Sequence, residues 1–162
     1  MSSPTATSAQ IPAHLVGKHA VLLFHGRGLI SALIRWQTRG TYSHAALLMP
    51  DGNIIESWPG VGVRITRLKD WEGVDAFSVE GMTQRQWKLA IGFAREEVGA
   101  KYDYRAILRF VTRRKMPENR RRFCSEFVHS CLRRAGWPLL ARKPDSEISP
   151  EALGTSIRLV PE

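Results

Sequence analysis

Cysteine is scarce in this chain, which has only Cys124 and Cys131 among its 162 residues. Two cysteines cannot form a disulfide framework. They lie seven residues apart on one predicted helix, roughly 10 Å at about 1.5 Å per residue, whereas a disulfide needs Cα atoms within roughly 7 Å. Both are expected to be free thiols, with Cys131 in a packing role. CxxC and HxxxH spacings are missing too, so we expect no zinc site, no other metal and no cofactor.

Long hydrophobic runs are also missing, because none approaches the roughly 18 apolar residues that span a bilayer. The first ten residues have neither a basic start nor an apolar stretch, so they do not predict a Sec signal peptide. We expect residues 1–14 to be a disordered lead and residues 15–162 to form a single domain. The protein is expected in the cytoplasm as synthesised, with delivery to a cell wall only through lysis or specialised secretion.

Acidic residues are in deficit, with 15 Asp and Glu against 24 Lys and Arg, a formal net charge of +9. Much of the excess falls in one predicted loop before Cys124. Such a loop attracts an anionic polymer or membrane surface, although a solvated basic loop without a partner fits equally well. We expect no specific nucleic acid. The residues of this basic loop are Arg113, Arg114, Lys115, Arg120, Arg121 and Arg122.

Hydrophobic periodicity predicts an α+β domain, an antiparallel β-sheet packed against helices. The helix over residues 84–98 is the clearest, because Thr83 and Gln86 form a capping box and Gly99 ends it. Four prolines after residue 137 predict an irregular surface tail over residues 138–162. Strands are expected at residues 20–25, 42–49, 54–58, 61–66 and 74–79, and the other helices at residues 29–37, 103–112 and 124–135.

Cys124 opens the last predicted helix, in the run FCSEFVHSCL. At a helix N-terminus the unpaired backbone N–H groups and the positive end of the macrodipole favour the thiolate, which is the nucleophilic form. A cysteine enzyme places its reactive sulfur at such a position. The alternative is a small buried side chain, since free cysteine is among the most buried residue types.

A second candidate cluster lies in a predicted hairpin around Asp51-Gly52. His44 is near the start of its first strand and Glu56 near the end of its second. A two-residue loop puts the two side chains on opposite faces, whereas an odd-length loop with Gly52 in the left-handed conformation puts them on one face. A triad of Cys124, His44 and Glu56 therefore requires an odd-length hairpin, and a two-residue turn would leave Glu56 facing solvent.

The order of these pieces resembles the circularly permuted branch of the NlpC-type papain-fold hydrolases, the YiiX/YebB-like group. The matching pieces lie within residues 17–137, and one departure is Lys18-His19, where the family usually shows Gly-Asp. The resemblance implies a permuted papain-like fold in which Cys124 is the nucleophile, His44 the base and Glu56 the orienting acid. It also implies cleavage of an amide bond in peptidoglycan stem peptides. The pieces are GKHAVLLF (residues 17–24), SH (43–44), IE (55–56), VGAKYDY (98–104) and FCSEFV (123–128).

Two other functions stay open. The permuted fold also resembles the lecithin retinol acyltransferase-like enzymes, which act on lipid acyl groups. The basic loop and three expected exposed aromatics, Trp36, Trp58 and Trp71, would suit a membrane surface. The third hypothesis is a non-catalytic polyanion-binding module in which Cys124 is structural.

Other polar residues receive weaker assignments. Tyr42, Tyr102 and Ser125 are candidate substrate-binding residues, although Tyr42 at the strand start also fits simple packing. His129 lies on a helical stripe with Glu126, Ser130 and Arg133, which predicts a solvated face. His25 ends the first strand, where it either lines the cleft or is a loop residue without a role.

Overall fold

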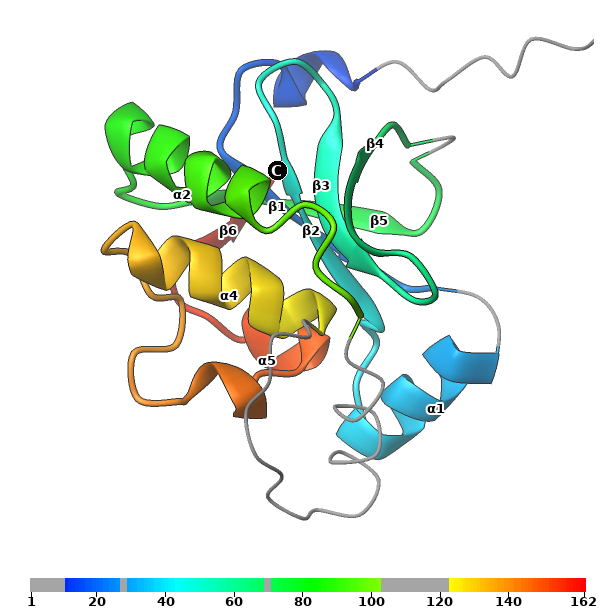
Figure 1. Cartoon of the computed structure of the whole chain (residues 1–162). Coiled ribbons are helices and arrows are strands. Elements are labelled where there is room, and N and C mark those ends of the chain that lie inside the picture. Colours follow the sequence, from blue (N-terminus) through cyan, green and yellow to red (C-terminus); the bar gives the residue numbers. More distant parts are fainter. Residues whose placement is uncertain (1–10, 27–28, 69–70, 103–122) are drawn as a thin grey trace, which may run out of the picture.

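The computed structural model describes residues 11–26, 29–68, 71–102 and 123–162 (Figure 1). The strands are β1 (Ala20–Phe24), β2 (His44–Leu48), β3 (Ile54–Trp58), β4 (Gly62–Thr66), β5 (Val74–Val79) and β6 (Leu159–Pro161). The helices are α1 (Leu29–Thr38), α2 (Gln84–Glu96), α4 (Cys124–Arg134) and α5 (Pro150–Gly154), with short 3₁₀ turns η1 (Ala13–Leu15) and η2 (Asp145–Glu147). The predicted helix at residues 103–112 and the basic loop at residues 113–122 lie outside the described residues.

The strands form one six-stranded sheet in the order β4-β3-β2-β1-β5-β6, and each neighbouring pair is antiparallel. Helices α2 and α4 lie side by side across one face of this sheet (Figure 1). This arrangement confirms the predicted α+β class and the antiparallel sheet packed against helices.

Both faces of the central strands are buried, which explains why β1 and β2 read as nearly continuous apolar runs. The first core fills the space between the sheet and the helices and includes Leu47, Trp87 and Phe127. The second core lies on the other face of the sheet and includes Leu22 and Leu48. Side chains alternate between these two cores along each strand, so the strand register decides what each face carries.

Helix α2 starts as its sequence predicts. The Thr83 hydroxyl accepts a hydrogen bond from the Gln86 N–H at 3.2 Å, and the Gln86 side chain accepts one from the Thr83 N–H at 2.9 Å. This reciprocal pair satisfies two of the N–H groups that a helix start leaves unpaired. Helix α4 likewise begins at Cys124, as predicted.

The C-terminal residues were wrongly expected to be an irregular surface tail. They form η2, α5 and the edge strand β6, and they bury Leu139, Ile148 and Leu153. These elements are three to five residues long, too short for a hydrophobic period to be visible in the sequence. At the other terminus Ile11 and Leu15 pack on the second core.

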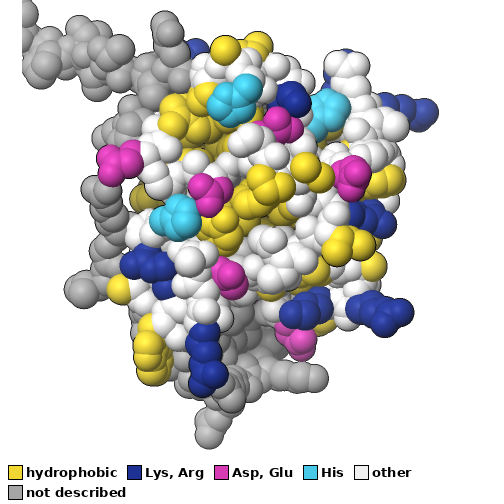
Figure 2. Space-filling model, turned by 180° about the vertical axis from the view of Figure 1, so that it is seen from behind, with side chains coloured by type: hydrophobic (Ala, Val, Ile, Leu, Met, Phe, Trp, Pro, Cys, Tyr) yellow, Lys and Arg dark blue, Asp and Glu magenta, His cyan; other side chains and the backbone are white. Residues whose placement is uncertain are grey.

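Charged side chains of both signs are interspersed over the face opposite to that of Figure 1 (Figure 2). The net positive charge of the chain therefore does not gather among the described residues of that face. Within the described part of the chain, no helix is both long and apolar enough to cross a membrane.

Candidate active site

The β2–β3 hairpin has the odd-length loop that the triad requires. Ala46 pairs with Glu56 and Leu48 with Ile54. The Met49 N–H then donates to the Asn53 carbonyl at 2.8 Å, which closes a loop of residues 50–52. Gly52 has φ 84°, in the left-handed region. The predicted register is confirmed, and it puts His44 and Glu56 on the same face of the sheet.

His44 and Glu56 are directly hydrogen-bonded. The His44 Nε2–H donates to the Glu56 carboxylate at 2.6 Å, and both side chains are buried. The rings of Phe24 and Trp58 lie 5.1 Å and 5.2 Å from the imidazole, and these contacts restrict its orientation. Because Nε2 is engaged by Glu56, Nδ1 is the nitrogen that is left for another partner.

Glu56 has a second charged partner, Arg64, on the next strand. Both Nε and Nη2 of Arg64 donate to the other carboxylate oxygen, at 3.0 Å and 2.8 Å. Burial alone would raise the pKa of Glu56, but the hydrogen bonds and charges of His44 and Arg64 outweigh it and hold that pKa below its usual value. Sequence reasoning missed Arg64, because only the β3–β4 register places it opposite Glu56.

Cys124 is the first residue of α4 and pairs with His44. Burial by itself lowers the pKa of His44, but the charge and hydrogen bond of Cys124, together with those of Glu56, raise it to about 9. The imidazole is therefore protonated at neutral pH, between a sulfur and a carboxylate. The structure brings together the three residues predicted as the triad.

The Cys124 side chain is covered in this conformation, with the residue 1% exposed. It packs in a small cluster with Ile34 of α1, Tyr102 and Phe123. The Tyr102 and Phe123 rings contact each other with centroids 5.9 Å apart. Of the three candidate substrate-binding residues, Tyr102 is therefore the one that shares a buried cluster with Cys124.

Ser125 and Tyr42 have other partners. The Ser125 hydroxyl is fully buried and donates to the Ile148 carbonyl at 2.6 Å, so it holds α4 to the C-terminal segment and is not available to a substrate. The Tyr42 hydroxyl donates to Asp75 at 2.7 Å, and burial together with this carboxylate raises the pKa of the phenol. Its ring packs against the first core, which agrees with the packing alternative.

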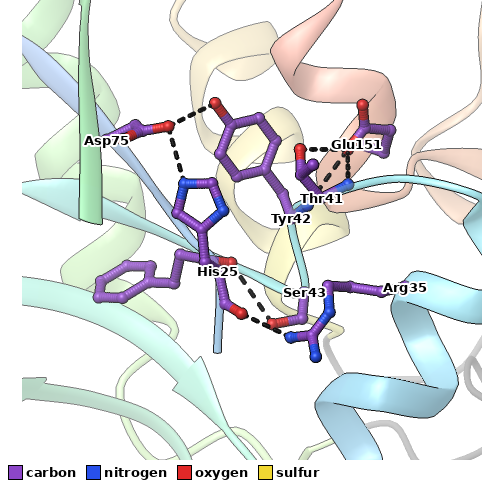
Figure 3. A network of polar contacts seen from close by, with 8 residues as sticks. His25, Arg35, Thr41, Tyr42, Ser43, Asp75 and Glu151 are labelled. Atoms are coloured by element: carbon purple, nitrogen blue, oxygen red, sulfur yellow. Dashed lines mark hydrogen bonds and ion pairs between the residues drawn. The ribbon is translucent and has the colours of Figure 1, made fainter. Parts of the chain in front are cut away.

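A polar network holds the segment that leads into β2 (Figure 3). The Glu151 carboxylate of α5 accepts hydrogen bonds from the N–H groups of Thr41 at 2.7 Å and Tyr42 at 3.2 Å. The half-exposed His25 imidazole is hydrogen-bonded to the Asp75 carboxylate at 2.9 Å. The network connects α5 and β5 to the chain two residues before His44.

His129 was wrongly placed on a solvated face. It is 0% exposed. Its Nδ1–H donates to Asp145 at 2.6 Å, while its Nε2 accepts from the Leu140 N–H at 3.2 Å. Glu126 and Ser130 on the same stripe are also buried. His129 and Arg133 of this stripe bind Asp145 in the C-terminal segment, and the Glu126 carboxylate accepts a hydrogen bond from the Phe123 N–H.

Other donors do not gather into a metal centre in the described residues, where no group of three or more His, Cys, Asp or Glu side chains has the arrangement to hold an ion. Both cysteines are free thiols, as predicted, and Cys131 packs in the first core.

An antiparallel sheet with a Cys-His-Glu constellation at one end defines an α+β protein with a thiol-containing site. No protein-family model matches the chain, and no curated protein matches its sequence. Its fold is similar to that of a solved structure, the metalloprotein YiiX from Escherichia coli O157:H7. The TM-score is 0.69 over 90% of this chain and 95% of YiiX, at 19% sequence identity. The likeness shows that the chain has a YiiX-like fold.

Proposed function

We propose that the protein is a cysteine hydrolase with a permuted papain-like fold that cleaves an amide bond. Cys124 is the nucleophile, His44 the acid–base and Glu56 the residue that orients the imidazole. The observation that carries this proposal is the buried Glu56–His44 hydrogen bond, with Cys124 as the other charged partner of the imidazole. Nucleophile, base and orienting group in mutual reach are the geometric signature of covalent acyl transfer.

In the proposed reaction the proton of the thiol resides on His44, and the Cys124 sulfur attacks the amide carbonyl carbon. The tetrahedral intermediate collapses when His44 donates its Nδ1 proton to the leaving nitrogen, which departs as an amine and leaves a thioester. Water then loses a proton to Nδ1 and attacks the thioester carbonyl. The carboxylic acid product leaves and the thiolate–imidazolium pair is restored.

The start of α4 supplies the electrostatic support for this reaction. The backbone N–H groups of its first turn point out of the helix N-terminus, at the positive end of the macrodipole. In the proposal, the Cys124 N–H donates to the oxyanion that forms on the attacked carbonyl. This arrangement stabilises the negative charge on the thiolate before attack and on oxygen after it.

The substrate class that we propose is a bacterial cell-wall stem peptide, as the resemblance to the NlpC-type hydrolases implies. The lipid alternative depended partly on exposed aromatic residues. Trp36 is 71% exposed. Trp71, however, packs against the second core, so it is not part of a continuous aromatic surface. The polyanion-binding alternative depended on the basic loop, which lies outside the described residues.

A metal does not enter the proposed mechanism. YiiX is described as a metalloprotein, but the donor set of this chain does not fit a metal ion, because His44 Nε2 is engaged by Glu56 and the described residues hold no three-donor cluster. We therefore derive no step through a metal.

The proposal is tested with wild type, Cys124→Ala and the matched control Cys131→Ala, each incubated with purified peptidoglycan and with acyl-lipid vesicles. We expect release of stem-peptide fragments by wild type and by Cys131→Ala, none by Cys124→Ala, and intact lipids throughout. Cys124-dependent release of fatty acid would assign the protein to the lipid enzymes instead.

Thiol labelling separates an enzyme from a binding module without knowledge of the substrate. Iodoacetamide should modify Cys124 faster than Cys131 near neutral pH, because a thiolate paired with imidazolium reacts and a core thiol does not. Equally slow labelling of both cysteines would contradict the proposal and favour the non-catalytic module.

A further inference from the structure

Arg64 lies beyond the three residues of the proposed triad and contacts only one of them. Its Nε and Nη2 atoms both donate to Oε1 of Glu56, while the His44 Nε2–H donates to Oε2. Each carboxylate oxygen therefore has its own partner, from a strand on either side of β3. The two sets of hydrogen bonds together define the position and the plane of the carboxylate.

The guanidinium is itself held in place. Its central carbon lies 4.8 Å from the centroid of the Trp58 ring, which provides a cation–π contact. The same ring meets the His44 imidazole edge-on at 5.2 Å. Trp58 thus packs against both charged partners of Glu56, and the four side chains form one unit on the same face of the sheet.

We propose that Arg64 is a positioning residue, which keeps the Glu56 carboxylate in the orientation and charge state that His44 requires. This inference rests on the proposed function of the triad. Arg64 acts through Glu56 and does not itself touch the sulfur.

The physical reason is the burial of Glu56, which is 2% exposed. A buried carboxylate without a cation tends to take up a proton. Among the described residues, the charged groups that face Glu56 are His44 from β2 and Arg64 from β4. Without Arg64, the pKa of Glu56 is raised by burial and held down by His44 alone.

Protonation of Glu56 would reverse its hydrogen bond with His44. A neutral carboxylic acid donates through its O–H, so Nε2 becomes the acceptor. The Nε2 proton passes to the carboxylate, the imidazole keeps only its Nδ1 proton, and the proton taken up from solvent resides on the sulfur. That tautomer faces the sulfur with an N–H and cannot take a proton from the thiol. The thiolate–imidazolium pair is lost, and with it the reactivity of Cys124.

The test measures the rate of Cys124 alkylation by iodoacetamide between about pH 5 and about pH 9, in wild type, Arg64→Met and Arg64→Lys. Arg64→Met should move the acidic limb of the profile up by about one pH unit and slow alkylation there about tenfold. Arg64→Lys keeps a cation but loses the forked geometry, so its profile should lie between the other two. Superimposable wild-type and Arg64→Met profiles would overturn the inference.

Arg67→Met is the matched control, because Arg67 follows β4 and binds the Asn53 side chain instead of Glu56. Its profile should match that of wild type. Glu56→Gln supplies the second control. If Arg64 acts through Glu56, then Arg64→Lys changes nothing further in the Glu56→Gln background, whereas an undiminished effect in that background would overturn the inference. This comparison uses the milder variant, so it holds even if Arg64→Met fails to fold.

The failure of this inference differs from the failure of the proposed function. Suppose that Cys124 of wild type is labelled fast and in a pH-dependent way, and that the Arg64 variants behave identically. This result would reject only the positioning role of Arg64. If Cys124 of wild type is labelled no faster than Cys131 at any pH, the proposed hydrolase function is rejected, and the positioning role of Arg64 is rejected with it.

Discussion

The Nε2 atom of His44 lies 2.6 Å from a carboxylate oxygen of Glu56, although the two residues do not pair directly across the sheet. Glu56 pairs with Ala46, two residues along β2 from His44. Diagonal neighbours on one face of a sheet are within reach of a long side chain. The contact therefore depends on the loop between the strands, since a loop one residue shorter or longer would turn Glu56 to the other face.

Gly52 adopts a left-handed conformation in the hairpin loop, so we expect its replacement by alanine to destabilise the fold. Gly52→Ala adds a Cβ at φ 84°, where L-residues are strained, and places it 2.6 Å from the Ile11 side chain. We expect the free energy of unfolding to fall by about 1 to 2 kcal/mol. Urea denaturation followed by circular dichroism measures this change.

Gly92→Ala is the control for that substitution, with the opposite sign. Gly92 lies inside α2, and a Cβ there would meet nothing within 4 Å. The free energy of unfolding should rise by about 0.5 to 1 kcal/mol, because alanine has the higher helix propensity. A Gly52→Ala protein as stable as wild type would contradict the importance of the left-handed turn.

The raised pKa of His44 predicts an alkaline limit to hydrolysis. Below a pH of about 9 the imidazole keeps the proton that the leaving nitrogen needs, so the rate of hydrolysis should fall as pH rises through this value. Glu56→Gln removes one of the causes that raise the pKa of His44, and the limit should move to lower pH. The measurement is the pH profile of hydrolysis, and a limb that stays in place in Glu56→Gln would show that the carboxylate does not act on His44.

The same shift has a consequence for stability. A histidine whose folded pKa is raised stabilises the fold fully below its unfolded pKa of 6.5, and this contribution disappears as pH rises through about 9. Wild type should therefore lose stability over this range, as thermal unfolding at several pH values would show. His44→Gln, which cannot titrate, should lack that loss.

Asp145 predicts a change at the acidic end. Burial would raise its pKa, but hydrogen bonds from His129 and Arg133 lower it to about 2 from an ordinary value of 3.8. Its contribution is present above pH 3.8 and is lost as pH falls toward 2. Asp145→Asn should lower the free energy of unfolding at neutral pH by about 2 kcal/mol and weaken its acid dependence. Glu147→Gln, an exposed neighbour, should do neither in the same urea titrations.

The covered sulfur of Cys124 predicts that its neighbours limit reagent access. Ile34→Ala shortens one of the side chains packed around Cys124, so iodoacetamide should label Cys124 several-fold faster. The substitution also costs about 2 to 4 kcal/mol of stability as a large-to-small change in a buried site. Leu22→Ala in the second core is the control for that loss. Equal acceleration in both variants would mean that general loosening, and not local cover, governs access.

Much of the local structure could be predicted because its causes are local. The turn chemistry of Asp51-Gly52, the capping residues of α2 and the alternation along β4 each act within a few residues. The odd-length hairpin was a sharper prediction, since it came from combining the turn residues with the requirement that His44 and Glu56 share a face. The register then confirmed it.

The errors fall where a residue's partner is distant in the chain. His129 was assigned to a solvated face because its own helix is polar on that side, and the covering segment carries Asp145. Trp71 was expected to be exposed, yet it packs against the second core. No role was predicted for Glu151, because its partners are the backbone N–H groups of Thr41 and Tyr42, more than a hundred residues away in the chain.

The sequence by itself determined strands β1 to β5, helices α1, α2 and α4, and the position of a thiol at a helix start, because these depend on near neighbours. The odd-length hairpin followed only from the added requirement that His44 and Glu56 share a face. Only the tertiary structure decided that Arg64 completes the surroundings of Glu56, that the C-terminal segment covers α4, and that Ile34 and Tyr102 cover Cys124. Those outcomes depend on strand pairing and on packing between segments that are distant in the chain. A local sequence pattern carries no information on which of the possible pairings has the lowest free energy.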